Sequence, residues 1–173
     1  MTLANKITVL RIVAIPILVI TLLQQYLLAA RIIFVVSALS DAVDGALARI
    51  RGERSPLGTF LDPLADKLLL VATFVSFTFL GWIPVWVFIV ILSRDVLILL
   101  GWTVVYILTG NSKIQPRALG KATTAFQMAL ALALLINLPA PYYIWLLDGV
   151  IAVTILSGLD YIWIGNRRLS AVG

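Results

Sequence analysis

Residues 84–108 read PVWVFIVILSRDVLILLGWTVVYIL, and this stretch decides the fold class. Only Arg94 and Asp95 carry charge within it, and it is long enough for a helix to cross a hydrocarbon core, which takes about 20 apolar residues. The rest of the chain has the same character, because 62% of its 173 residues are hydrophobic and 12% are charged. Soluble domains average about 25% charged residues, so the composition excludes a water-soluble globular protein and a disordered chain.

Polar and Gly/Pro clusters divide the apolar sequence into six candidate helices. The expected spans are 7–28, 32–49, 61–80, 84–108, 118–138 and 143–164. No long linker separates them, so we expect a single domain over residues 1–173. The sequence therefore predicts an all-α integral membrane protein, a bundle of six transmembrane helices.

The basic residues orient this bundle. With six spans, ten Lys and Arg residues fall on the side that holds both termini: Lys6, Arg11, Arg49, Arg51, Arg54, Lys113, Arg117, Lys121, Arg167 and Arg168. Only Arg31 falls on the other side, so the positive-inside rule predicts a multi-pass protein of the plasma (inner) membrane with both termini in the cytoplasm. The first span resembles a signal peptide in its charge pattern, but we expect it to be a retained helix. Basic residues at membrane boundaries favour lipid head groups and argue against a nucleic-acid partner.

The absence of two residue types narrows the chemistry. The chain has no cysteine and no histidine, which excludes thiol nucleophiles, cysteine-bound zinc and the usual general base near neutral pH. Catalysis would have to rest on carboxylates, Lys, Arg, Tyr, Ser or Thr. Any metal would be a hard ion that prefers oxygen ligands.

Four of the eight acidic residues lie within 26 positions: Asp41, Asp44, Asp62 and Asp66. The first two share one helix face, and the last two are one turn apart on the next span. The short connection from Arg49 to Gly58 forces these spans to be antiparallel, so both pairs converge near the cytoplasmic ends. Four such carboxylates repel one another and are costly inside a bilayer. Bound Mg²⁺ or Mn²⁺ would offset the repulsion.

Two structural explanations stay open beside the metal site. The carboxylates could pair with basic residues of other helices, for example Asp66 with Arg49. Gly45 and Ala48, on the face of Asp41 and Asp44, could be helix-packing residues, or they could leave room for a flat ligand to approach the backbone.

The sequence around the carboxylates resembles the signature of the CDP-alcohol phosphotransferases, Asp-x2-Asp-Gly-x2-Ala-Arg-x8-Gly-x3-Asp-x3-Asp. Residues 41–49 (DAVDGALAR) and 58–66 (GTFLDPLAD) contain every fixed position at the family's spacing. Residues 5–11 (NKITVLR) are similar to the amino-terminal segment of the phosphatidylglycerophosphate synthase and cardiolipin synthase branches. Residues 93–95 (SRD) and 120–124 (GKATT) are similar to marks of their fourth and fifth spans.

This resemblance implies a six-helix enzyme, usually a homodimer, with a polar cavity on the cytoplasmic side and CDP-diacylglycerol as the donor. The implied metal ligands are Asp41, Asp44, Asp62 and Asp66. The implied CDP-binding residues are Asn5, Thr8, Gly45, Ala48, Arg49 and Gly58, of which Arg49 supports the diphosphate. Asp66 is the implied general base for the acceptor hydroxyl.

The acceptor is sought among a second set of basic residues, Arg94, Arg117 and Lys121. Arg94 lies inside an apolar span, where a cation either forms an ion pair or holds an acceptor phosphate. Many phosphatidylglycerophosphate synthases carry Arg-Glu and Gly-Lys-x-Lys-Thr at these two marks, whereas this chain has Arg94-Asp95 and Thr123 in place of the second Lys. Arg-Asp is closer to the cardiolipin synthases. We expect glycerol 3-phosphate as the acceptor, with phosphatidylglycerol as the alternative.

A function of another class also fits intramembrane aspartates, namely a small ion-conducting transporter. Clustering of the carboxylates at one membrane boundary, rather than along a path across the bilayer, argues against it. A purely structural scaffold would not need four costly carboxylates. Metal-dependent release of CMP would occur only in the enzyme.

Overall fold

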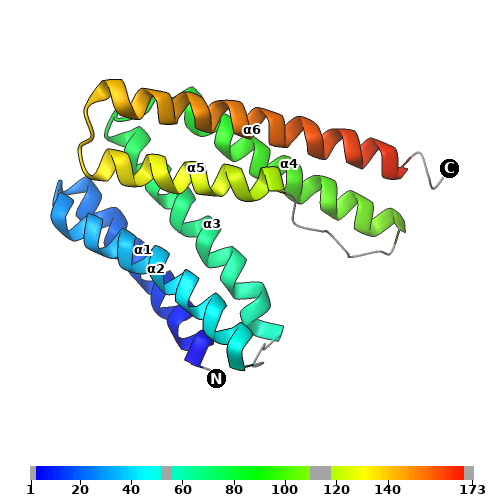
Figure 1. Cartoon of the computed structure of the whole chain (residues 1–173), viewed down its shortest axis with the longest axis horizontal. Coiled ribbons are helices and arrows are strands. Elements are labelled where there is room, and N and C mark those ends of the chain that lie inside the picture. Colours follow the sequence, from blue (N-terminus) through cyan, green and yellow to red (C-terminus); the bar gives the residue numbers. More distant parts are fainter. Residues whose placement is uncertain (1–2, 52–55, 110–117, 170–173) are drawn as a thin grey trace. The chain divides into compact units, whose positions relative to one another are not determined.

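The computed structural model describes the backbone of residues 3–51, 56–109 and 118–169, and the side chains of 7–40, 61–101, 103, 104, 107 and 118–164. These residues form six helices and no strand, as predicted (Figure 1). The helices are α1 (Leu3–Leu23), α2 (Leu27–Arg51), α3 (Pro56–Phe79), α4 (Val85–Thr109), α5 (Ala118–Leu135) and α6 (Ala140–Leu169).

Three helix ends differ from the predicted spans because of one recurring turn. Gln25, Gly81 and Asn137 adopt the left-handed conformation, with φ of 61°, 72° and 55°, after α1, α3 and α5. At the first turn, the amides of Gln25 and Tyr26 donate to carbonyls of the preceding helix at 3.0 and 2.8 Å, and the other two turns repeat this pattern. This is the Schellman arrangement that ends a helix. The prediction that the first helix continues to residue 28 is therefore wrong, since residues 27 and 28 begin α2.

One compact unit contains α1, α2 and α3 together with residues 134–137. Within it α1 packs along both α2 and α3. Its core includes Leu18 and Leu22 of α1 and Phe74 and Phe77 of α3, all fully buried. The ring of Phe77 also stacks on Trp82, with centroids 5.2 Å apart.

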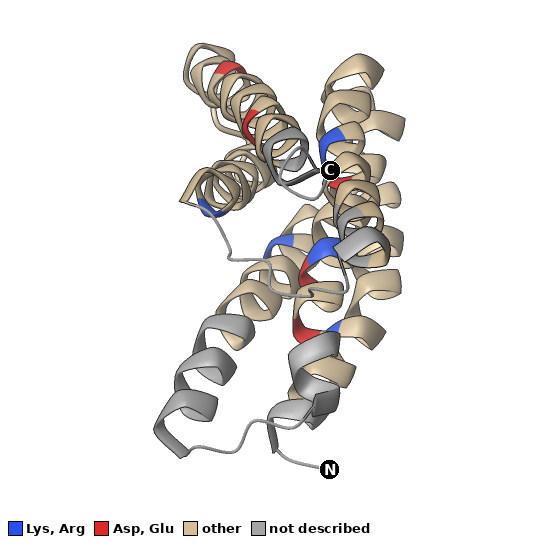
Figure 2. Ribbon diagram, turned by 90° about the vertical axis from the view of Figure 1, so that its right-hand side faces the viewer, with Lys and Arg blue, Asp and Glu red and all other residues tan. Residues whose placement is uncertain are grey.

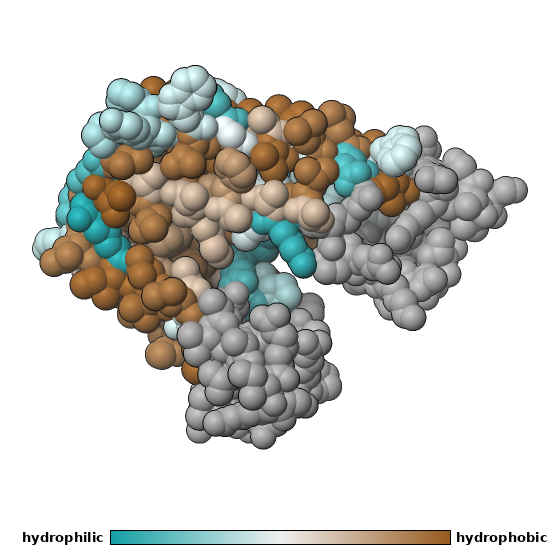
Figure 3. Space-filling view, in the orientation of Figure 1, coloured by the Kyte–Doolittle hydropathy of each residue, from teal (hydrophilic) through white to brown (hydrophobic). Residues whose placement is uncertain are grey.

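Helix α1 has one buried face and one exposed face. Thr8, Arg11, Ile15, Leu18 and Leu22 are buried, spaced three and four residues apart. The face that they leave outside is also apolar, with Leu10, Val13, Ile17 and Ile20 about half exposed or more. Figure 3 shows apolar side chains over much of the described surface. A helix that is apolar on its outer face and on most of its buried face is typical of a membrane span or a large buried core.

The second compact unit contains α4, most of α5, and α6. Helix α4 packs along α6, and the buried side chains include Val87 and Ile91 of α4 and Val150 of α6. A Cβ built on Gly149 of α6 would lie 2.9 Å from Cε1 of Phe126, so α5 and α6 approach closely there because residue 149 has no side chain.

Two of the described helices, over Ala118–Leu135 and Ala140–Ile164, are long and apolar enough to span a membrane by a length and hydropathy criterion. Two shorter apolar helices cover Ile7–Leu23 and Leu27–Ser40. Six helices are thus observed, while six spans remain a prediction.

Candidate active site

Asp62 and Asp66 lie one turn apart on α3, and both are half-buried. The predicted sharing of one helix face is confirmed. Each carboxylate accepts a bond from α1. The Thr8 hydroxyl donates to Oδ1 of Asp62 at 2.7 Å, and Nη1 of Arg11 lies 2.8 Å from Oδ1 of Asp66. Figure 2 shows acidic and basic residues close together on the helices near the N-terminus.

The α2 half of the predicted site is described only as backbone. Asp41, Asp44, Gly45, Ala48 and Arg49 belong to α2, which packs on α1 and contacts α3 within the same unit. Their side chains lie outside the described residues, and the same holds for Asn5 and Gly58. Arg117 lies outside the described residues altogether.

The described part of this site offers the kind of ligands that a hard divalent cation prefers. Asp62 and Asp66 present carboxylate oxygens, which Mg²⁺ and Mn²⁺ prefer. Among the described side chains no group of three acidic residues gathers at a metal-binding distance. A complete ligand set would therefore need residues of α2, where the sequence supplies Asp41 and Asp44.

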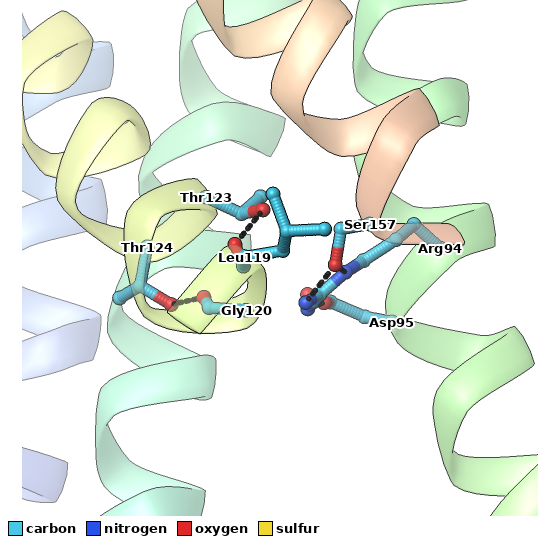
Figure 4. A network of polar contacts seen from close by, with 7 residues as sticks. All are labelled: Arg94, Asp95, Leu119, Gly120, Thr123, Thr124 and Ser157. Carbon is cyan, nitrogen blue, oxygen red and sulfur yellow. Dashed lines mark hydrogen bonds and ion pairs between the residues drawn. The ribbon is translucent and has the colours of Figure 1, made fainter. Parts of the chain in front are cut away.

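Arg94 lies in the second unit, on α4, and is 6% exposed. Figure 4 shows its guanidinium between Asp95 and Ser157 of α6. Nη1 lies 2.8 Å from Oδ1 of Asp95, and Nη2 and Nε donate to the Ser157 hydroxyl at 2.7 and 3.2 Å. The ring of Tyr161 faces the guanidinium carbon, 5.8 Å from the ring centroid, a distance at which cation–π attraction acts.

The start of α5 completes the surroundings of Arg94. A Cβ built on Gly120 would lie 3.1 Å from Nη2 of Arg94 and 3.6 Å from the Tyr161 hydroxyl, so the guanidinium occupies space that a side chain would fill. Lys121, the next residue, is exposed. Thr123 is fully buried and donates to the Leu119 carbonyl at 2.9 Å.

The bonds described for Arg94 leave it some donor capacity. A guanidinium carries five N–H groups. One N–H each of Nε, Nη1 and Nη2 is used by Ser157 and Asp95, which leaves one N–H on each terminal nitrogen. Each remaining N–H group can donate a charge-assisted hydrogen bond to a phosphate or carboxylate oxygen.

The sequence did not single out several residues that the structure brings to these two places. Arg11 was read as a boundary charge, yet it is buried against Asp66. Its spacing of three residues from Thr8 was the available signal, since both then lie on one helix face. Ser157 and Tyr161 have no comparable signal, because only the packing of α6 on α4 brings them to Arg94.

Comparison with known proteins gives a consistent result. The sequence pattern of the CDP-alcohol phosphatidyltransferase family matches residues 1–157. The chain is 34% identical over 180 residues to the CDP-diacylglycerol–glycerol-3-phosphate 3-phosphatidyltransferase of Bacillus subtilis, covering 92% of each chain. It is 32% identical over 181 residues to a probable phosphatidylglycerophosphate synthase of Mycobacterium tuberculosis, covering 99% of this chain and 83% of that one. It is also 31% identical over 158 residues to the human cardiolipin synthase (CMP-forming), covering 82% and 52%.

Proposed function

Because this chain belongs to the CDP-alcohol phosphatidyltransferase family, we propose that it moves a phosphatidyl group from CDP-diacylglycerol to glycerol 3-phosphate and releases CMP. The observation that carries the choice of acceptor is the similarity to the Bacillus subtilis enzyme, which extends over 92% of both chains and whose name states that acceptor. The similarity to the Mycobacterium tuberculosis protein supports the same choice.

In the proposed reaction, Asp66 accepts the proton of the acceptor hydroxyl as its oxygen attacks the phosphorus that carries diacylglycerol. The bond from that phosphorus to the CMP oxygen breaks, and CMP leaves with the electron pair. Asp66 suits this role because its side chain is 26% exposed, whereas the Arg11 side chain bonded to it is 1% exposed. The carboxylate is thus the accessible member of the pair.

The donor site combines the carboxylates with small residues of α2 and α3. Mg²⁺ or Mn²⁺ held by Asp41, Asp44, Asp62 and Asp66 would neutralise charge on the pyrophosphate and on the leaving CMP. The proposed CDP-binding residues are Asn5, Thr8, Gly45, Ala48, Arg49 and Gly58. The support is the complete sequence signature and the observed spacing of Asp62 and Asp66 on α3.

The acceptor phosphate is proposed to bind Arg94, together with Arg117 and Lys121. The burial of Arg94 and its two remaining N–H groups support this role. The Asp95 carboxylate 2.8 Å away offsets part of the charge of Arg94. A partly neutralised cation would favour a singly charged phosphodiester, and this observation keeps phosphatidylglycerol, and thus cardiolipin synthesis, as the second candidate.

We further propose that the protein is a homodimer and crosses the plasma (inner) membrane six times, with both termini in the cytoplasm. The apolar outer face of α1 and the two described helices of spanning length support a bilayer environment. The basic residues at one set of helix ends support the orientation.

Release of CMP by the purified protein in detergent tests the proposal. CDP-diacylglycerol is supplied with Mg²⁺, Mn²⁺ or a chelator, and glycerol 3-phosphate and phosphatidylglycerol are offered separately. Metal-dependent release with glycerol 3-phosphate is the expected result. Release with phosphatidylglycerol alone would establish the second candidate, and silence with both in folded protein would refute the transferase reaction with either acceptor.

A further inference from the structure

Two hydrogen-bond donors of α1 bond to two carboxylates of α3, and the donors and the carboxylates have similar spacing along their helices. Thr8 and Arg11 are three residues apart, and Asp62 and Asp66 are four residues apart, so each pair occupies one turn of its helix. The Thr8 hydroxyl bonds to Asp62 at 2.7 Å, and Arg11 bonds to Asp66 at 2.8 Å. One turn of α1 is thus bonded to one turn of α3 at two points.

The donors are less accessible than the carboxylates they hold. Thr8 is fully buried, and the Arg11 side chain is 1% exposed while that of Asp66 is 26% exposed. A ligand approaching this site would meet the carboxylates, with the donors behind them. A buried partner of this kind fixes the orientation of a carboxylate without itself touching the ligand. For Thr8 this role would replace the direct contact with CDP proposed above, because Thr8 is fully buried and its hydroxyl donates to Asp62.

We propose that Thr8 and Arg11 are positioning residues, Thr8 orienting Asp62 for cation binding and Arg11 orienting Asp66 for proton transfer. This inference rests on the proposed function, because it takes the roles of the two carboxylates from it. The physical reason is the restriction of side-chain rotamers. A carboxylate on a flexible side chain samples several rotamers, and a bond of about 2.8 Å to a buried donor selects one of them.

A purely structural role would give different consequences. If the two bonds served only to anchor α1 on α3, weakening either would lower stability and leave the folded protein with normal kinetic constants. Positioning instead predicts two separate defects, because the two donors hold carboxylates with different tasks. Loss of the hydrogen bond from Thr8 would weaken cation binding, and loss of the bond from Arg11 would slow turnover.

The test uses the full-length protein in detergent with three variants. Thr8→Val removes the hydroxyl at nearly constant volume, and Arg11→Lys keeps the charge but loses the planar fork. Arg31→Lys is the matched control, since Nε of Arg31 donates to the Leu135 carbonyl in the same unit and touches no carboxylate among the described contacts. Thermal unfolding, Mn²⁺ binding followed by the electron paramagnetic resonance of free Mn²⁺, and CMP release are measured for each.

Thr8→Val is expected to weaken Mn²⁺ binding by about tenfold, the lower range for loss of a residue that orients a metal ligand. Arg11→Lys is expected to lower kcat by about tenfold to a hundredfold with KM for CDP-diacylglycerol within about twofold, because misplacing a reacting group by about 1 Å has effects of that size. Arg31→Lys is expected to change the unfolding temperature alone.

Several results would overturn the inference while leaving the proposed function standing. One is wild-type Mn²⁺ affinity in Thr8→Val together with wild-type kcat in Arg11→Lys. Another is a failure of both Arg11→Lys, which keeps the charge, and Arg11→Gln, which keeps only a neutral donor, to fold, which would make Arg11 an anchor of α1. Failure of the proposed function itself would look different, since the wild-type protein would then release no CMP.

Discussion

Replacing Gly120 by alanine should weaken acceptor binding without weakening the fold. The new Cβ would lie 3.1 Å from Nη2 of Arg94, a separation at which the neighbour must give by a few tenths of an ångström. The guanidinium has little freedom to move, because Ser157 and Asp95 hold it at 2.7 and 2.8 Å. The strain therefore falls on the N–H groups proposed to meet the acceptor phosphate.

The size of the effect follows from the strength of such bonds. A hydrogen bond to a charged group contributes about 1.5–3 kcal/mol, and a shift of this size would cost part of it. A loss of about 1 kcal/mol corresponds to about a fivefold rise in KM for the acceptor. In the opposite direction, alanine in place of glycine stabilises a helix by about 0.5–1 kcal/mol. Unfolding free energy should then stay within about 1 kcal/mol of wild type.

Two other helical glycines provide controls for this experiment. A Cβ on Gly158 would meet Cγ of Arg94 at 3.9 Å, an ordinary contact, and a Cβ on Gly101 of α4 would meet nothing within 4 Å. Steady-state CMP release at saturating CDP-diacylglycerol, with glycerol 3-phosphate varied, gives KM for all three variants. Gly158→Ala and Gly101→Ala should match wild type. An unchanged acceptor KM in Gly120→Ala would refute the placement of the acceptor at Arg94.

Three further predictions address the carboxylates, the helix packing and a turn. Asp66→Asn should lower CMP release by at least about a hundredfold while sparing much of the CDP-diacylglycerol binding, since a general base contributes about 10²–10⁴-fold. Near-normal turnover would remove Asp66 from the role of base. Gly149→Ala should destabilise the protein by about 1–3 kcal/mol, because its Cβ would lie 2.9 Å from the Phe126 ring. Denaturant unfolding measures this change, and an unchanged unfolding free energy would contradict the close approach of α5 and α6. Gln25→Gly should raise the unfolding free energy by about 1 kcal/mol, because φ at residue 25 is 61° and glycine adopts this conformation at no steric cost. Thermal unfolding tests this, and a lower unfolding temperature of the variant would contradict the reasoning.

The sequence predicted what depends on local pattern. Asp62 and Asp66 share a face of α3 because four residues make about one helical turn, and the structure confirms this. The six helices follow from apolar runs and their breaks. The end of the first helix was misplaced by five residues because Gln25, unlike glycine, gives no signal of the left-handed conformation that it adopts.

What depends on contacts between distant residues could not be predicted. Arg11 and Asp66 are 55 residues apart, and Arg94 and Ser157 are 63 apart. From the sequence, Arg94 could either form an ion pair or bind an acceptor phosphate, and the sequence did not decide between these two roles. The structure gives it Asp95 as an ion-pair partner and Ser157 as a hydrogen-bond acceptor, while two of its N–H groups stay available in the described contacts. Periodicity within one helix says which face a residue occupies, and it says nothing about which helix lies opposite.

The left-handed turns at residues 25, 81 and 137 recur at a constant interval of 56 residues, and each separates two consecutive helices, α1 from α2, α3 from α4 and α5 from α6. The first of these turns bears on how the protein is made, because the carboxylates of the proposed site are divided between α2 and α3. If the helices enter the bilayer in chain order during synthesis, α1 and α2 bring only half of the proposed ligand set. The proposed site is then completed when α3 docks on α1, the step that joins Asp62 to Thr8 and Asp66 to Arg11. A growing chain would acquire this site in the same event in which its first three helices assemble into one compact unit.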